Sequence, residues 1–339
     1  MKRYFYVLTL AFAVALMASA TTFGKQQTTR RGRAAAPTAQ AATANVLALL
    51  PASDAVALVD MRRLLKDALP RAYNNNPAEL ARVNAEIDKF KTSTGLDARS
   101  LDRLAVGVSY KQTATGKTLV ETVAIARGTF RSASFNAPNS PMHEEKYAGK
   151  TIRIFNVDAQ VKLLGLFNMR VTDLAVAAID ANTIAVGKLE RVRAAIDASA
   201  GRGERVSSDI TALATHDANA ILGAGGNVPA SLTQGLDIGN LSKSIASVRQ
   251  FYSTLGTTAN GFQMLTGLRT DDAGAAKMLS STIAGLKQLA PFALGQMADA
   301  KARPLRSLVE NTKVNAEGND VLITLELAQV DVAALIDAF

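Results

Sequence analysis

The stretch that decides the fold is VAAIDANTIAVGKLERVRAAID, residues 176–197. Small and β-branched residues on both sides of Asp180-Ala181-Asn182 predict two strands joined by a tight turn. Beyond the second strand, Leu189, Val192 and Ile196 recur at i, i+3 and i+7, which predicts a helix with one apolar stripe. Because this connection is too short for the crossover that parallel strands need, we expect an antiparallel sheet.

The same succession of apolar strand, short turn and amphipathic helix recurs along the chain. It is found in residues 55–69, 220–232, 263–279 and 323–337. The order of elements in the first half returns in the second, which indicates a tandem duplication. The sequence therefore predicts an α+β fold of two similar halves, residues 46–200 and 201–339. Each half is expected to be a mainly antiparallel sheet with helices packed on one face.

The N-terminal residues predict export. Lys2 and Arg3 precede an apolar run that is too short to span a bilayer, and Ala18-Ser19-Ala20 offers small residues for a signal peptidase. We expect a signal peptide at 1–20 with cleavage after Ala20, and a periplasmic or secreted protein with no transmembrane span in the mature chain. Residues 21–45 are small and polar and predict a flexible, basic linker.

The net charge of +9 does not indicate a nucleic-acid partner. Six of the 38 basic residues lie in residues 1–45, which contain no acidic residue, so the other 32 face 29 acidic residues. The folded part is thus nearly balanced. The chain has no Trp to provide a stacking surface and no Cys to form disulfides. We expect no nucleic-acid binding and a fold held by an ordinary apolar core.

Two segments carry a resemblance to known proteins: LLPASDAVALVDMRRLL at 49–65 and DANTIAVG at 180–187. Together with the signal peptide and the small-residue linker, they resemble secreted or periplasmic bacterial families of unknown function whose mature domain starts with a Leu-Pro-x-x-x-Ala strand and continues as α+β repeats. Such families carry no established activity, so the resemblance implies a fold and no site residues.

Two glycine-containing segments invite a phosphate-binding interpretation, and neither fits. In ANAILGAGGNVPASL, residues 218–232, Gly223 and Gly225 match a dinucleotide fingerprint, but Val228 stands at its third glycine. We interpret this stretch as a turn before a helix. In ATGKT, residues 114–118, the glycine that a P-loop requires is replaced by Lys111, so a hairpin turn is expected.

The residue types for other chemistry are scarce. His143 and His216 are the only histidines, and no Cys is present. His143 is expected in a loop, where its neighbours Glu144 and Glu145 would point in different directions and bind no metal. His216 is interpreted as a surface or capping residue. Ser109 lies in an alternating strand without the second glycine of a nucleophile elbow.

The sequence thus offers no catalytic, cofactor-binding or metal-binding residue and implies no cofactor. We expect a non-enzymatic envelope or extracellular binding or scaffold module, which binds a protein, a polymer or an apolar ligand through the sheet or between the halves. The alternative is a carboxylate-based hydrolase acting on an envelope polymer, which would need Asp or Glu side chains converging in a concave site. Self-association through an exposed sheet edge is a third expectation.

Overall fold

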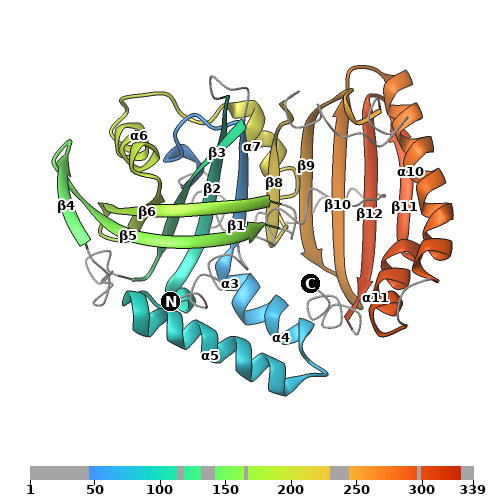
Figure 1. Cartoon of the computed structure of the whole chain (residues 1–339), viewed down its shortest axis with the longest axis horizontal. Helices are drawn as coiled ribbons and strands as arrows, with labels where there is room; N and C mark the ends of the chain where they lie inside the picture. Colours follow the sequence, from blue (N-terminus) through green and yellow to red (C-terminus); the bar gives the residue numbers. More distant parts are fainter. Residues whose placement is uncertain are drawn as a thin grey trace, which may run out of the picture.

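The computed structural model describes residues 46–112, 118–130, 142–163, 167–229, 244–295 and 299–329 (Figure 1). The predicted signal peptide and linker, and the last predicted helix near the C-terminus, lie outside these residues. Within them, twelve strands form one sheet in the order β11-β12-β10-β9-β8-β1-β2-β3-β7-β6-β5-β4. Every neighbouring pair is antiparallel, as predicted.

Groups of consecutive strands are separated by helices along the chain. The strands are β1 (Ala55–Asp60), β2 (Leu101–Gln112), β3 (Thr118–Gly128), β4 (Met142–Tyr147), β5 (Lys150–Leu163), β6 (Phe167–Asp180), β7 (Thr183–Gly187), β8 (Leu222–Asn227), β9 (Val248–Thr257), β10 (Gly261–Thr270), β11 (Thr312–Glu317) and β12 (Asp320–Ala328). In Figure 1, β5 and β6 run across β1–β3, which shows how strongly the sheet is twisted and curved.

Two predicted hairpin turns are confirmed. Between β6 and β7, the Asp180 carboxylate accepts a hydrogen bond from the backbone N–H of Asn182 at 2.8 Å. Between β11 and β12, Gly318 has φ of 58°, a conformation that favours glycine. Short turns of this kind fix the register of each hairpin.

Strand β1 lies at the centre of the sheet and joins its two sides. It pairs with β2 on one edge and with β8 on the other; Ala57, for example, lies opposite both Val106 and Ala224. The segments on either side of residue 200 therefore share one continuous sheet and do not form two separate ones.

One face of the sheet is covered by α3 (Met61–Arg63), η1 (Leu64–Ala68), α4 (Leu69–Ala72) and α5 (Pro77–Thr94). Buried Met61, Ile87 and Phe90 belong to the same apolar cluster as Val59 and Val106 of the central strands. Figure 1 shows these helices grouped at one end of β1–β3.

Helix α10 (Ala273–Leu294) covers the same face farther along the sheet, with α11 (Asp299–Glu310) beside it (Figure 1). Its buried Ala276 and Leu279 pack with Ile323 of β12. Alternation along β12 directs Ile323 and Leu327 to the same side, and Leu327 contacts the cluster that contains Ala72 of α4. Helices α4 and α10 therefore share a face.

The opposite face is covered by α6 (Leu189–Ser199) and α7 (Ser208–Ala214). Val192 of α6 and Ile210 of α7 pack in one cluster with Val56 and Ala105, which alternate with residues facing α3–α5. The prediction of helices on one face of each half is therefore wrong for both halves: α3–α5 and α6 of the first half lie on opposite faces, and so do α10 and α7 of the second. The physical reason is that β1 is apolar at successive positions, so both of its faces must be covered.

Candidate binding site on the sheet

The glycines of residues 223–226 lie inside strand β8, so the predicted turn is wrong. A Cβ on Gly223 would fall 2.1 Å from the carbonyl oxygen of Ala214, and one on Gly225 would fall 2.4 Å from Cβ of Leu213. These glycines therefore allow α7 to lie directly against β8. Their role in the described structure is close packing, and they form no phosphate-binding loop.

The second glycine-containing segment joins two paired strands. Residues 113–117 lie outside the described residues, but Gln112 and Thr118 on either side are partners in the antiparallel β2–β3 ladder. A P-loop would instead join a strand to a helix. Ser109 lies in β2, as predicted, and donates a hydrogen bond to the carbonyl oxygen of Ala52 at 3.3 Å.

His143 lies in edge strand β4, so its predicted placement in a loop is wrong. Its two acidic neighbours are held by arginines: Arg153 pairs with Glu144 at 3.2 Å, and Arg193 pairs with Glu145 at 2.5 Å. Among the described residues, no group of three or more His, Asp or Glu side chains is arranged to hold a metal ion.

One shielded carboxylate lies near the beginning of β3, close to the start of α6. Glu121 is 6% exposed, and its carboxylate pairs with Lys111 Nζ at 2.7 Å and Lys188 Nζ at 2.8 Å. Burial alone would raise the pKa of Glu121, but the two lysines outweigh it and hold the pKa below its ordinary value. Glu121 is therefore ionised at neutral pH and cannot supply a proton as a general acid.

Polar side chains form a row across four neighbouring strands on the face that carries α7. Gln250 of β9 is the register partner of Asn227 and of Arg269, and Arg269 is the register partner of Asp320. Gln250 Nε2 donates to Asn227 Oδ1 at 3.1 Å, and an Arg269 amino group donates to Gln250 Oε1 at 3.3 Å. We call Asn227, Gln250, Arg269 and Asp320 the polar row.

At one end of the polar row, Arg269 and Asp320 form a bidentate ion pair. Arg269 Nε lies 3.0 Å from one carboxylate oxygen of Asp320, and an amino nitrogen lies 3.3 Å from the other. Such fork-to-fork pairs fix the guanidinium plane. Because the positive charge of Arg269 is matched by Asp320, the row presents hydrogen-bonding groups with no net charge.

Tyr252 is a buried side chain beside this row. It is 4% exposed and lies two residues from Gln250 on the same face of β9, with Gly225 and Gly267 as its register partners. A Cβ on Gly267 would lie 2.1 Å from Cζ of Tyr252, so the ring lies directly over that glycine. Burial, with the nearby charge of Asp320 as the second cause, raises the pKa of Tyr252 to about 12.

A pocket of about 320 Å³ opens above the row, between α7 and the sheet. Its lining comprises Asp209, Ala212, Leu213, His216, Gln250 and Arg269. His216 follows α7 and is exposed, as expected for a surface residue, but its ring also lies 4.3 Å from the Tyr252 ring, centroid to centroid. The pocket therefore combines a carboxylate, an amide, a guanidinium and an imidazole, and the imidazole lies against the buried ring of Tyr252.

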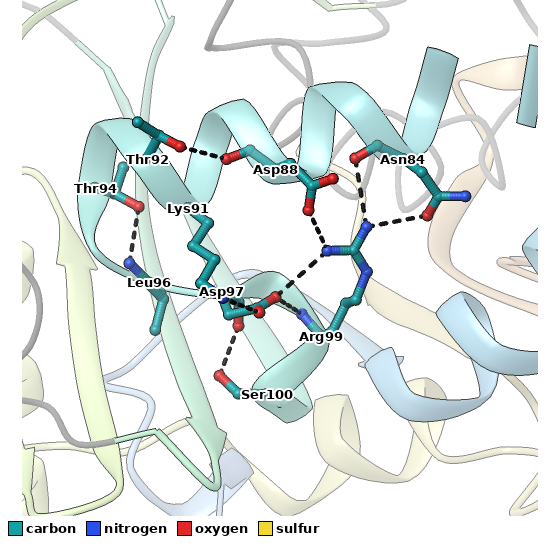
Figure 2. Close-up of polar contacts among 9 residues, drawn as sticks. All are labelled: Asn84, Asp88, Lys91, Thr92, Thr94, Leu96, Asp97, Arg99 and Ser100. Carbon is teal, nitrogen blue, oxygen red and sulfur yellow. Dashed lines mark hydrogen bonds and ion pairs between the residues drawn. The ribbon is translucent and has the colours of Figure 1, made fainter. Parts of the chain in front are cut away.

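A second pocket, of about 70 Å³, lies between α3 and α5. Its lining includes Arg99 of η2 (Ala98–Ser100), whose guanidinium is already engaged, as Figure 2 shows. Arg99 donates to Asp88 Oδ1 at 2.6 Å and to Asn84 Oδ1 at 3.1 Å, while its backbone N–H donates to Asp97 at 2.9 Å. This cluster links α5 to the next strand, so we assign it a structural role.

Sequence reasoning considered His216 but missed the rest of the pocket. Gln250, Arg269 and Asp320 come from three strands, and only the register of the sheet brings them together. The one signal within the sequence is the spacing of Gln250 and Tyr252, which places two hydrogen-bonding side chains on the same face of a strand.

No protein-family model matches this chain, and no curated protein matches it. Among solved structures, it is similar to crystal form III of TP0453, with 13% identity, 86% of this chain and 98% of that chain covered, and a TM-score of 0.44. It is also similar to crystal form I of TP0453, with 10% identity, 86% and 96% coverage, and a TM-score of 0.40. None of the described helices has the length and apolar character needed to cross a bilayer.

Proposed function

We propose that this protein is a non-enzymatic binding module of the cell envelope and that it binds its ligand in the pocket above the polar row. The observation that carries the proposal is the convergence of Asp209, His216, Gln250 and Arg269 on one cavity. Polar groups that converge beside a residue of shifted pKa are one mark of a functional site.

The ligand class follows from the lining. Gln250 offers both donors and acceptors, Arg269 offers donors, and exposed Asp209 offers acceptors. Since Asp320 already balances Arg269, the pocket does not select an anion. Hydroxyl groups satisfy such a mixed set best, because each both donates and accepts. We therefore propose a neutral, hydroxyl-rich segment of an envelope polysaccharide as the ligand.

The alternative function, a carboxylate-based hydrolase, receives less support. Glu121 is a shielded carboxylate of the kind that such an enzyme would use. Its two lysine partners keep it ionised, however, whereas the acid of a glycosidase must hold a proton at the working pH. The pairing of Asp320 with Arg269 ties up a second carboxylate in the same way.

The proposal includes the duplication that the sequence indicates. The order β1-β2-β3-β7-β6 on one side of the sheet corresponds to β8-β9-β10-β12-β11 on the other. We propose that residues 46–200 and 201–339 arose from one ancestral unit, joined through β1 and β8. The expected signal peptide at residues 1–20 would deliver this module to the periplasm or beyond, where envelope polymers occur.

The test is isothermal titration of the purified protein with soluble neutral oligosaccharides, chitohexaose as the first sugar and maltohexaose as the second. Arg269→Ala is expected to weaken binding about tenfold, since it removes the two N–H donors that Asp320 and Gln250 leave free, at about 1 kcal/mol each. Arg249→Ala is the matched control, because Arg249 lies on the same strand as Gln250 and pairs with Asp271 at 2.7 Å, but does not line the pocket. Absence of binding to either sugar, or equal losses in both variants, would refute the proposal.

A further inference from the structure

A second row of polar side chains crosses the strands β1, β2, β3 and β7. Each of its members is the register partner of the next. The row lies on the face that carries α6 and α7, because its members alternate with this face's apolar side chains; Arg103, for example, is two residues from Ala105, and Arg127 is two residues from Ile125. We call the row the arginine row, and its four residues are Asp60, Arg103, Arg127 and Thr183.

The arginine row matches the polar row position by position. Each row takes the last residue of one strand, the third residue of the next strand in the sheet, the second-to-last residue of the third strand and the first residue of the fourth. Because β1 and β8 are antiparallel, the two rows lie at opposite ends of the strands. The matched residues are Asp60 and Asn227, Arg103 and Gln250, Arg127 and Arg269, and Thr183 and Asp320.

The two rows differ in the partner of the arginine at their third position. Arg269 forms its bidentate ion pair with Asp320, whereas the register partner of Arg127 is the uncharged Thr183. Within the described part of the chain, the Arg127 guanidinium has no hydrogen-bond or ion-pair partner. The next carboxylate along the ladder, that of Asp180, accepts a hydrogen bond from the backbone of its own hairpin turn at 2.8 Å. Arg127 therefore lacks the carboxylate that Arg269 has.

The rest of the arginine row does not supply the missing negative charge. Arg103 lies directly opposite Arg127, and like charges in this position destabilise a sheet. Asp60 pairs with Arg103 and also accepts from the backbone N–H of Arg63, so it balances one of the two guanidinium groups. Among the described residues, Arg103 Nε and Thr183 Oγ1 are buried without a hydrogen-bond partner. The row thus carries one positive charge in excess and unused hydrogen-bonding groups.

We propose that Arg127 anchors a second binding site, which takes a carboxylate of a ligand as Arg269 takes the carboxylate of Asp320. A carboxylate fits a guanidinium through two parallel hydrogen bonds, and the chain itself makes this contact in the polar row. Arg127 is only partly buried, so solvent reaches its side chain. The ligand class is therefore acidic. The site lies apart from the pocket above the polar row and does not depend on the function proposed for that pocket.

The test is NMR of the arginine Nε–H groups and of the Thr183 amide during titration with acetate, which replaces chloride at constant ionic strength. The signals of Arg127 and Thr183 are expected to shift in a saturable way, whereas that of Arg269, already paired, should not move. Arg127→Gln should weaken acetate binding about tenfold at the Thr183 amide, because it removes a charge and two charge-assisted hydrogen bonds. Arg249→Gln, a change outside the row, is the matched control and should leave acetate binding unchanged.

Exchanging the fourth residues of the two rows tests the proposal independently. Thr183→Asp gives Arg127 the carboxylate that it lacks and should abolish the response of its signal to acetate. Asp320→Thr removes the partner of Arg269, whose signal should then respond to acetate. A response of Arg127 that Thr183→Asp leaves in place, or no saturable response of Arg127 in the unchanged protein, overturns the proposal. Equal or tighter binding of methanesulfonate, a tetrahedral anion of the same charge, would show that the site does not select carboxylates and would overturn it as well.

Discussion

The ring of Tyr252 lies directly over Gly267, so that a Cβ on this glycine would fall 2.1 Å from Cζ of the ring. The contact is cross-strand, since the two residues are register partners on β9 and β10. Gly267 leaves room for the ring, and His216, which lines the pocket, lies against the ring on the α7 side.

Gly267→Ala is therefore expected to displace Tyr252 and lower the free energy of unfolding by about 1–3 kcal/mol, the usual cost of overpacking. Gly256→Ala on β9 is the matched control, because a Cβ there meets no atom within 4 Å, and its effect should stay within about 0.5 kcal/mol. Urea denaturation measures both. Equal stabilities for the two variants would contradict the placement of the ring.

The lowered pKa of Glu121 predicts that the stability of the protein falls in the acid range of pH. Because its pKa is lowered in the folded state, its contribution is present above the unfolded value of 4.5 and is lost as the pH falls through the folded pKa. Glu121→Gln should cost about 1–3 kcal/mol at pH 7, and the difference from the unchanged protein should shrink below about pH 4. A difference that is constant from pH 7 to pH 3 would show that the two lysines do not hold this carboxylate ionised.

The raised pKa of Tyr252 predicts that the stability of the protein falls in the alkaline range of pH. Its pKa is raised from 10.0 to about 12, so between these values the unfolded chain loses the phenol proton while the folded chain keeps it. The stabilising contribution is therefore complete below pH 10 and falls as the pH rises toward 12. Tyr252→Phe should flatten this part of the stability curve, as measured by urea denaturation at pH 9 and pH 11. An unchanged curve would place Tyr252 in contact with solvent.

Two arginines that look alike in the sequence should differ in their contributions to stability. Arg191 is 9% exposed and donates to the carbonyl oxygen of Ala52 at 2.8 Å and to Ser53 Oγ at 2.9 Å, which ties α6 to the segment before β1. Arg191→Ala should cost about 1–3 kcal/mol. Arg99→Ala should lower the free energy of unfolding by less than about 1 kcal/mol, because Arg99 and its partner Asp88 are exposed. Thermal unfolding compares them; the reverse order would contradict the described burial.

Local patterns predicted much of the sheet. The turns at Asp180–Asn182 and Glu317–Asn319, and the strands that they join, follow from turn chemistry and alternation, which act over a few residues. Helix α10 follows from a long apolar stripe. These features depend on neighbours in sequence, and for that reason they can be recognised without the fold.

The features that the sequence does not predict depend on contacts between residues far apart in the chain. Gly223 and Gly225 predict a turn because glycine is permissive in turns, yet α7 needs the same lack of a side chain to lie against β8. The strand at 142–147 has no strand signal of its own, since its consecutive polar residues 143–146 offer no apolar alternation. The polar row exists only through the register of β8, β9, β10 and β12, which no local pattern fixes.

The measurement that tests the central claim most directly is the NMR spectrum of the imidazole groups during titration with soluble glycan chains. The chain has two histidines, His216 at the pocket and His143 in β4, so each spectrum contains its own control. Binding above the polar row predicts that the His216 signals shift in a saturable way while those of His143 do not move. Saturable binding that leaves His216 unchanged, or no binding at all, would contradict the account.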